Sequence, residues 1–373
     1  MLRALNWRYT FVLDVALLAL LIGALGVGWF LALVLTEFVM WLVRLIWISP
    51  AMLRFILRRL VHMIPTLIIV IAIGFALLQL APGDIFSQMA LNPDINPQEL
   101  ERFRAQFGLD EPWYVQFFLY LWNAIRGEFG FSQIYKAPVF ALVQQRAAAT
   151  IMLSLTALIV AWGASIPFGV IAATKQYKWQ DQAISVAAFF GLAIPNFFLA
   201  FLLLYLIATT GNWLPIGGMT STDFQSLGFF GKAVDLLQHL IVPAAVLGTS
   251  AMAGLTRIMR SSMLSVLNQQ YIITARAKGQ NERKVVYRHA LRNAINPMIT
   301  ILGFQIGAIM SGAALVENVI AWPGLGRLIL EALLAQDQYL VMGSLIYGVI
   351  LLVIGNLLAD ILLAVTDPRV RVG

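Results

Sequence analysis

The feature that most limits the fold of this chain is a set of long apolar runs. Each comes close to or passes the roughly 20 residues that an α-helix needs to cross the hydrocarbon core of a bilayer. None shows the two-residue alternation of a membrane β-barrel. We therefore expect six helical spans, at Leu60–Leu80, Thr150–Ala173, Ala183–Thr209, Leu236–Leu255, Met298–Val316 and Met342–Val365.

The composition agrees with a chain that lies mostly in lipid. Of its 373 residues, 60% are hydrophobic and only 12% are charged, and the mean hydropathy is +0.83. A soluble domain carries about twice that charged fraction. The absence of cysteine excludes disulfides, thiolate metal sites and cysteine nucleophiles. The fold class we predict is all-α, in a polytopic membrane protein.

The first 51 residues form an N-terminal extension whose role is open. The apolar run Phe11–Val34 favours an extra transmembrane helix before the six core spans. A signal peptide is one alternative, although the run is long and lacks a clear cleavage site. A start of the protein at Met52 is the other.

Lysine and arginine indicate the orientation of the spans. They gather before the first core span, between the second and third, from 257 to 292, and at the C-terminal tail. Cytoplasmic loops of membrane proteins carry such an excess. Alternating passes put all four groups on one side, so we expect the C-terminus of the core in the cytoplasm. The net charge of +7 then reflects these loops, and we expect no nucleic-acid partner.

The opposite, outer side carries the long segment from 82 to 146. Asn96-Pro97-Gln98-Glu99 is typical of a helix start, with Gly108 as a stop. A second helix is predicted at Pro112–Ile125, with one apolar stripe that suits a membrane surface or the neighbouring spans. The segment is either a structural lid or a contact for a partner.

The most informative stretch is the basic cytoplasmic segment from about 262 to 293. Residues 271–279 predict a helix closed by Gly279, and residues 280–289 predict a second one. The small side chains of Ala275 and Ala277 permit close approach of another surface. Two short helices joined at a glycine would form a compact knob for docking into a partner. A cationic loop on anionic lipid headgroups is the alternative.

The turn at Trp322-Pro323-Gly324, which follows Glu317 and Asn318, invites two interpretations. We expect a re-entrant or surface turn on the outer side. A structural role is favoured over gating.

In several stretches, which follow one another in the family's order, the sequence resembles the integral-membrane permeases of binding-protein-dependent ABC importers. The resemblance is greatest to the oligopeptide/dipeptide/nickel branch. The resemblance runs from about Met52 to Arg371. The stretches that carry it begin with the opening of the core and end in the tail: residues 52–60, Leu80-Ala-Pro-Gly-Asp84, 107–116, 127–132, 146–150, Thr274-Ala-Arg-Ala-Lys-Gly279, 287–293, 316–327 and Asp367-Pro-Arg369.

The resemblance implies a type I ABC importer permease fold in a prokaryotic inner membrane. It implies a second permease, in this family usually a different chain, two cytoplasmic ATPases that use ATP and Mg²⁺, and an outer binding protein that delivers the solute. Residues 52–145 would hold the first core span and the structured outer loop, and residues 146–373 the five-helix permease core. The ATPases would push on the coupling residues, which are Thr274, Ala275, Arg276, Ala277, Lys278 and Gly279. At position 273, where the general permease pattern has glutamate, this chain has isoleucine.

No enzyme chemistry is visible in the residues. The chain lacks the GxxxxGK[ST] loop that cradles nucleotide phosphates, so we predict no catalytic residue, no metal site and no cofactor bound by this chain. A stand-alone secondary transporter or channel is the alternative function, and it would need no ATPase. The sequence leaves the solute open among peptides, nickel chelates, opines and glutathione-like ligands.

Overall fold

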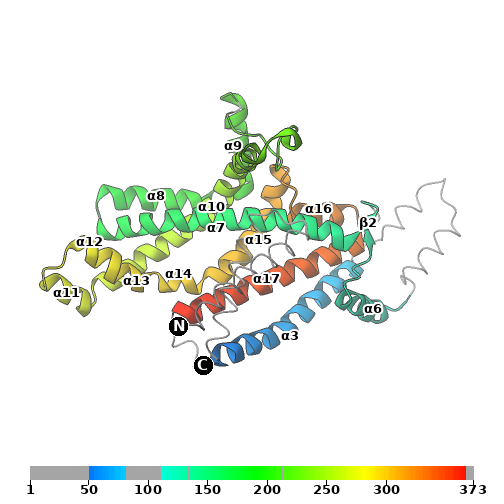
Figure 1. Ribbon diagram of the computed structural model, residues 1–373, viewed down its shortest axis with the longest axis horizontal. Helices are drawn as coiled ribbons and strands as arrows, with labels where there is room; N and C mark the ends of the chain where they lie inside the picture. Colours follow the sequence, from blue (N-terminus) through cyan, green and yellow to red (C-terminus); the bar gives the residue numbers. More distant parts are fainter. Residues whose placement is uncertain (1–49, 81–110, 133, 212, 367–373) are drawn as a thin grey trace, which may run out of the picture. The chain divides into compact units, whose positions relative to one another are not determined.

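The computed structural model describes residues 50–80, 111–132, 134–211 and 213–366 (Figure 1). The chain divides into two compact units, Met1–Ile64 with Pro368–Gly373, and Pro65–Asp367. Helix α3 (Pro50–Leu80) begins in the first unit and ends in the second. All other described elements belong to the second unit. The predicted span Phe11–Val34, the helix start at Asn96 and the stop at Gly108 lie outside the described residues.

Two long helices form the centre of the second unit. Helix α7 (Val139–Thr174) and helix α10 (Phe229–Leu267) pack along each other over much of their lengths (Figure 1). The buried face of α7 is rich in small side chains, among them Ala157, Ala161 and Ala172, which are fully buried. Small residues let helix backbones approach closely where lipid provides no hydrophobic driving force between helices.

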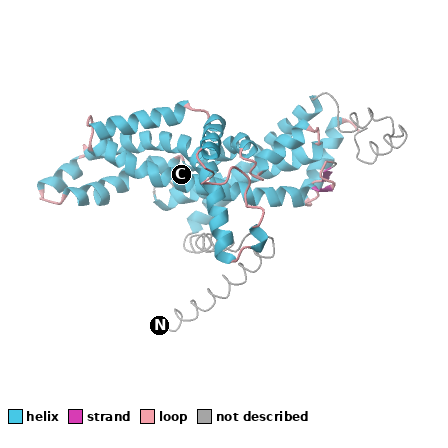
Figure 2. Ribbon diagram, turned by 90° about the horizontal axis from the view of Figure 1, so that it is seen from above, coloured by secondary structure: helices cyan, strands magenta, loops and turns pink. Residues whose placement is uncertain are grey.

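One end of α7 meets a group of elements from both halves of the chain. They are the last part of α3, the amphipathic helix α6 (Trp113–Ile125), the two-residue strands β1 (Phe131–Ser132) and β2 (Ala137–Pro138), helix α16 (Leu325–Leu334) and helix α17 (Gln338–Thr366). The strands pair antiparallel, Phe131 opposite Pro138, and are the only strands among the described residues (Figure 2). Buried side chains such as Phe75, Tyr120 and Leu340 form one apolar cluster here.

The other end of α7 meets a chain of short helices. They are α11 (Gln270–Ala277), α12 (Glu282–Lys284), the π-helix η2 (Val285–Ala290), α13 (Leu291–Ala294) and α14 (Asn296–Thr300). We call residues 270–294 the coupling element. The predicted helix closed by Gly279 and the second helix after it are both present.

Between these ends, helix α15 (Leu302–Val319) packs on α7, α9, α10, α16 and α17. Helix α8 (Trp179–Ala193) packs on α10, and α9 (Asn196–Thr209) follows it. A short 3₁₀ helix η1 (Phe224–Ser226) precedes α10.

Among the described residues, four helices are long and apolar enough to cross a membrane, and five if α8 and α9 count as one broken span. The four match the predictions at Leu60–Leu80, Thr150–Ala173, Leu236–Leu255 and Met342–Val365. The expected span Ala183–Thr209 is divided between α8 and α9, which meet at a bend of 103°. Pro195 lies at this bend and cannot donate the hydrogen bond that would continue α8. The expected span Met298–Val316 is divided between α14 and α15.

Candidate functional site

The coupling element rests on the rest of the unit through an apolar inner face. Ile272 and Ala275 of α11 are buried together with Val285 and Val286 of η2. The same cluster contains Met259 of α10, with further members from α7, α13 and α14. The short helices are therefore anchored to the ends of both long central helices, and a displacement of α11 presses directly on α10.

A tight turn at Gly279 ends α11. The N–H of Gly279 donates to the carbonyl of Arg276 (2.9 Å), and the N–H of Gln280 donates to the carbonyl of Ala275 (3.3 Å). These two bonds define a Schellman motif, in which the residue after the cap adopts the left-handed conformation. Gly279 has φ of +71°, a value that glycine adopts without steric cost. The glycine that the sequence marked as a helix stop does stop the helix.

Three polar contacts link α11 and its turn to the helices that follow. The Arg276 guanidinium donates to both carboxylate oxygens of Glu282, at 2.6 and 3.1 Å. Nε2 of His289 lies 2.9 Å from Oε1 of Gln280, and the Asn293 amide donates to the Tyr271 hydroxyl at 2.8 Å. The hydrogen bond from Arg276 holds the pKa of the Glu282 carboxyl below its ordinary value. The same bond raises the pKa of Arg276.

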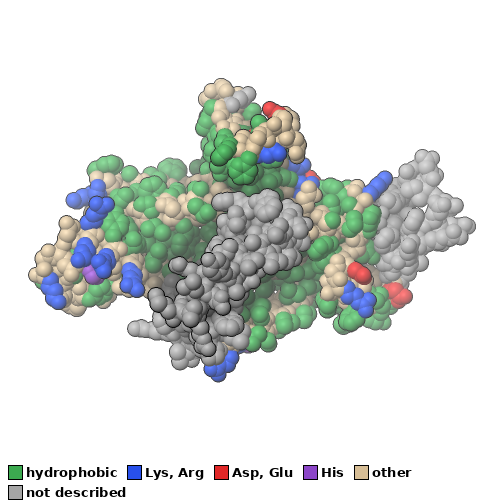
Figure 3. All heavy atoms as spheres, in the orientation of Figure 1, with side chains coloured by type: hydrophobic (Ala, Val, Ile, Leu, Met, Phe, Trp, Pro, Cys, Tyr) green, Lys and Arg blue, Asp and Glu red, His purple; other side chains and the backbone are tan. Residues whose placement is uncertain are grey.

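The outer face of the coupling element is open to the surroundings. Ile273 is 50% exposed, and Thr274, Ala277, Lys278 and Gly279 are exposed beside it. Lysine and arginine side chains gather around this end of the unit (Figure 3). This outer face is therefore accessible to a partner.

The structure brings the six predicted coupling residues together in one helix end, but they do not all point the same way. Thr274, Arg276, Ala277, Lys278 and Gly279 are exposed, whereas Ala275 is buried. The small side chain of Ala275 lets α11 lie close to the chain's own core, since it belongs to the same cluster as Val285 and Met259.

Sequence reasoning placed Glu317 before a turn but missed the polar centre that it forms with the other end of α7. We call Thr150 and residues 317–327 the Glu317 corner. The Glu317 carboxylate is fully buried and accepts bonds from the Thr150 hydroxyl (2.8 Å) and the Arg327 N–H (3.0 Å). The Thr150 oxygen in turn accepts the Leu325 N–H at 2.7 Å. Two free N–H groups at the start of α16 are thus satisfied from α15 and α7.

Of the expected re-entrant or surface turn between α15 and α16, Trp322 and Gly324 lie in the interior, whereas Ala321 is exposed. Trp322 has no exposed area, and its indole N–H donates to the Ala149 carbonyl at 3.1 Å. Burial is possible because the polar groups of the turn find partners inside the protein. The sequence alone could not show this anchoring, because Thr150 and Ala149 stand more than 160 residues before the turn, where no local pattern reveals them.

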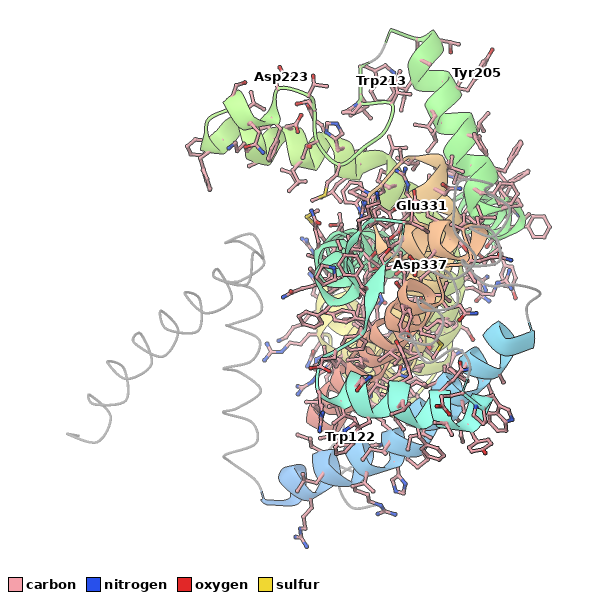
Figure 4. All side chains as sticks on the ribbon, turned by 90° about the vertical axis from the view of Figure 1, so that its right-hand side faces the viewer. Trp122, Tyr205, Trp213, Asp223, Glu331 and Asp337 are labelled. Atoms are coloured by element: carbon pink, nitrogen blue, oxygen red, sulfur yellow. The ribbon has the colours of Figure 1, made fainter. Side chains whose placement is uncertain are left out.

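Further buried or half-buried carboxylates fix other helix ends. Asp337, 1% exposed, accepts from the Ser132 hydroxyl (2.7 Å) and caps α17 through the Leu340 N–H (3.1 Å). Glu331 accepts from Tyr135 and from Nε of Arg327. In Figure 4, Glu331 and Asp337 lie within the helix packing, whereas Trp213 lies in the segment that follows α9. Within the part of the chain that the structure describes, no three His, Asp or Glu side chains could hold a metal ion.

Comparison with known proteins identifies the family. Residues 165–372 match the family described as binding-protein-dependent transport system inner membrane component, and residues 52–156 match its N-terminal counterpart. The chain is 41% identical over 321 residues to the oligopeptide transport system permease protein AppB of Bacillus subtilis, which covers 86% of this chain and all of that protein.

Two further relatives have the same extent. The dipeptide transport system permease protein DppB of Escherichia coli K12 is 37% identical over 336 residues, or 86% of this chain and 99% of that protein. The glutathione transport system permease protein GsiC of the same strain is 34% identical over 320 residues, with the same two shares covered. Relatives of this kind are transmembrane permease subunits of ABC importers. This chain belongs to the family of binding-protein-dependent transport system inner membrane components.

Proposed function

We propose that the chain forms one half of the pathway through which an ABC importer moves peptides across a prokaryotic inner membrane. Two of the relatives reported above carry oligopeptide and dipeptide transport in their names, which supports a peptide substrate. Glutathione, itself a small peptide, is the substrate in the name of the third. Residues 1–51 precede the region that the family matches, which supports treating them as an extension of the permease core beginning at 52.

Four partners complete the proposed machine: a second permease of a different sequence, two ATPases and an outer solute-binding protein. The ATPases carry the ATP and Mg²⁺, and this chain carries neither. The coupling element lies on the cytoplasmic side, together with Lys175, Lys178 and the C-terminus of the core. The excess of Lys and Arg at these places supports that orientation. The Glu317 corner then lies toward the outer side.

The ATPases act on the chain at residues 274–279. The observation that carries this assignment is the protruding, anchored turn: α11 ends in an exposed Schellman motif, yet its inner face is buried against α10. A partner that moves the exposed face of α11 therefore moves the end of a long transmembrane helix. Closure of the two ATPases around ATP would switch the pathway between its inward-facing and outward-facing states through this contact.

The test is recovery of the whole complex from its native membrane in mild detergent. Wild type should bring down a second permease and ATPases with ATP-hydrolysing activity. Gly279→Asp puts a Cβ and a charge onto the outer side of the turn, where a partner would lie, and should cut ATPase recovery at least fivefold while the second permease remains. Gly211→Asp is the matched control, because Gly211 is also exposed with positive φ and open space around it, but lies after α9. It should leave ATPase recovery unchanged.

Two outcomes would contradict the proposal in different ways. Equal ATPase recovery with wild type and Gly279→Asp would place the coupling contact elsewhere in the chain. Isolation of a lone, folded wild-type chain that transports solute without any ATPase would instead support a secondary transporter or channel. Uptake of labelled di- and oligopeptides by reconstituted complex, with and without the binding protein, tests the substrate class.

A further inference from the structure

An ion pair crosses the turn of the coupling element. Arg276 stands in the last turn of α11 and Glu282 in the first turn of α12. Two roughly parallel hydrogen bonds join them, from Nε to one carboxylate oxygen (3.1 Å) and from a terminal nitrogen to the other (2.6 Å). This paired geometry fixes the relative direction of the two side chains as well as their distance.

The stability of the fold does not explain this pair. The two side chains are 42% and 59% exposed, and ion pairs in such surroundings contribute only about 0–1 kcal/mol to folding. On the outer side of the turn a Cβ added at Gly279 would meet nothing within 4 Å, whereas the Gln280–His289 and Tyr271–Asn293 contacts hold α11 and its turn to η2 and α13. The ion pair adds to these contacts a link from α11 to α12, the short helix directly after the glycine.

We propose that Arg276 and Glu282 are positioning residues for energy coupling: they brace the Gly279 turn so that α11 and α12 move as one body. This inference rests on the proposed function, in which ATPases push on α11. Without the brace, the part of the push that passes through α12 would be lost in bending at Gly279, and only the direct contact of α11 with α10 would remain. With it, the push passes through α12 to Val285 and Val286, which lie in one buried cluster with Met259 of α10.

The experiment uses the complete complex, reconstituted with its ATPases and binding protein, and measures solute imported per ATP hydrolysed. Arg276→Ala and Glu282→Ala should each lower this ratio at least threefold while ATP hydrolysis continues. The exchanged pair Arg276→Glu with Glu282→Arg restores opposite charges across the turn and should bring the ratio back to within twofold of wild type. Arg283→Ala is the matched control, an exposed arginine of α12 whose loss should not change the ratio.

Each alternative result has a distinct meaning. If both single variants import as much solute per ATP hydrolysed as wild type, the proposal that this ion pair braces the turn is overturned. Failure of the exchanged pair to restore the ratio would show that each side chain acts separately, and would also overturn it. If wild type itself recovers no ATPase, the proposed function fails, and that failure is visible before any variant is compared.

A direct measurement covers the case in which single variants fail to assemble. The chain has no cysteine, so spin labels can be placed on the full chain at Gln270 and Arg288, both exposed. The distance distribution between them should be narrow in wild type and in the exchanged pair, and clearly broader in Arg276→Ala. Distance distributions of equal width in wild type and Arg276→Ala would overturn the proposed brace without any transport assay.

Discussion

Two helices of this permease end with the same pattern of backbone hydrogen bonds but in opposite surroundings. Helix α11 is closed by a turn at Gly279, two residues after its last residue. Helix α15 is closed by a turn at Ala321, where the Ala321 N–H donates to the Asn318 carbonyl (3.3 Å) and the Trp322 N–H donates to the Glu317 carbonyl (2.8 Å). Both residues are left-handed, with φ of +71° and +57°. Only the first is a glycine.

The difference lies in what holds each turn. A non-glycine residue in the left-handed region costs about 1–2 kcal/mol, and Ala321 bears that cost because its neighbours are fixed from elsewhere. Trp322 is buried and bonded to α7, and Glu317 is bonded to α7 and α16. The Gly279 turn is exposed and has mainly its own residues to hold it. The Glu317 corner at one end of α7 is therefore fixed by contacts between distant segments. The Gly279 turn at the other end stays accessible to a partner.

The largest expected effect comes from a substitution that disturbs the packing of the Glu317 corner. A Cβ at Gly326 would lie 2.5 Å from the Cα of Ala314, and a backbone atom cannot move aside as a side chain can. Gly326→Ala should therefore force α16 away from α15 and lower the free energy of unfolding by about 3 kcal/mol. Thermal unfolding of the purified permease measures this loss.

Gly254→Ala is the control for the loss of a glycine. Gly254 is also helical, but nothing lies within 4 Å of an added Cβ. Its replacement should leave stability unchanged or raise it by up to about 1 kcal/mol, because alanine favours a helix over glycine. Equal melting temperatures for Gly326→Ala and wild type would show that the corner is not closely packed.

A smaller effect, of opposite sign at the two helix ends, sharpens the comparison. Gly279→Ala should destabilise its turn by about 1 kcal/mol, whereas Ala321→Gly should stabilise its turn by a similar amount. The Ala321 side chain is exposed, so its removal costs no packing. Hydrogen exchange of peptides spanning 270–284 and 313–327 reports each turn locally.

The two substitutions act as controls for each other. Faster exchange in the first peptide and slower exchange in the second is the expected pair of results. Slower exchange in both peptides, or faster exchange in both, would mean that the backbone conformation of these two residues does not decide the stability of either turn.

The sequence predicted the parts of this molecule that depend on local pattern. The length and apolarity of α3, α7, α10 and α17 were sufficient to recognise them, because lipid requires long apolar helices. The stop at Gly279 was also predicted, since a glycine after a helix-forming run has a direct conformational meaning. The amphipathic stripe located α6 to within a residue of its observed bounds, Trp113–Ile125.

Contacts between distant segments could not be predicted from the sequence. Ala321 gives no sign of a left-handed turn, and Thr150 gives no sign that its hydroxyl will bond both Glu317 and Leu325. The apolar run 183–209 likewise conceals a 103° bend; its composition satisfies a single span, and only Pro195 hints at the break. In the coupling element, Arg276 and Glu282 are six residues apart, a spacing that no helical rule connects, because the turn between them sets their distance.

The smallest effect concerns the charge of that pair and returns to the accessible end of α7. Hydrogen bonding from Arg276 depresses the pKa of Glu282 in the folded protein. A carboxyl whose folded pKa is depressed contributes stability above its unfolded pKa and loses it as the pH falls through the folded one.

With spin labels at Gln270 and Arg288, the distance distribution should therefore stay narrow from pH 8 to about pH 5 and broaden only below the ordinary range of glutamate, near 4.5. In Arg276→Ala the distribution should be broad at every pH. A wild-type transition above pH 5 would contradict the depressed pKa, and with it the paired geometry at the Gly279 turn.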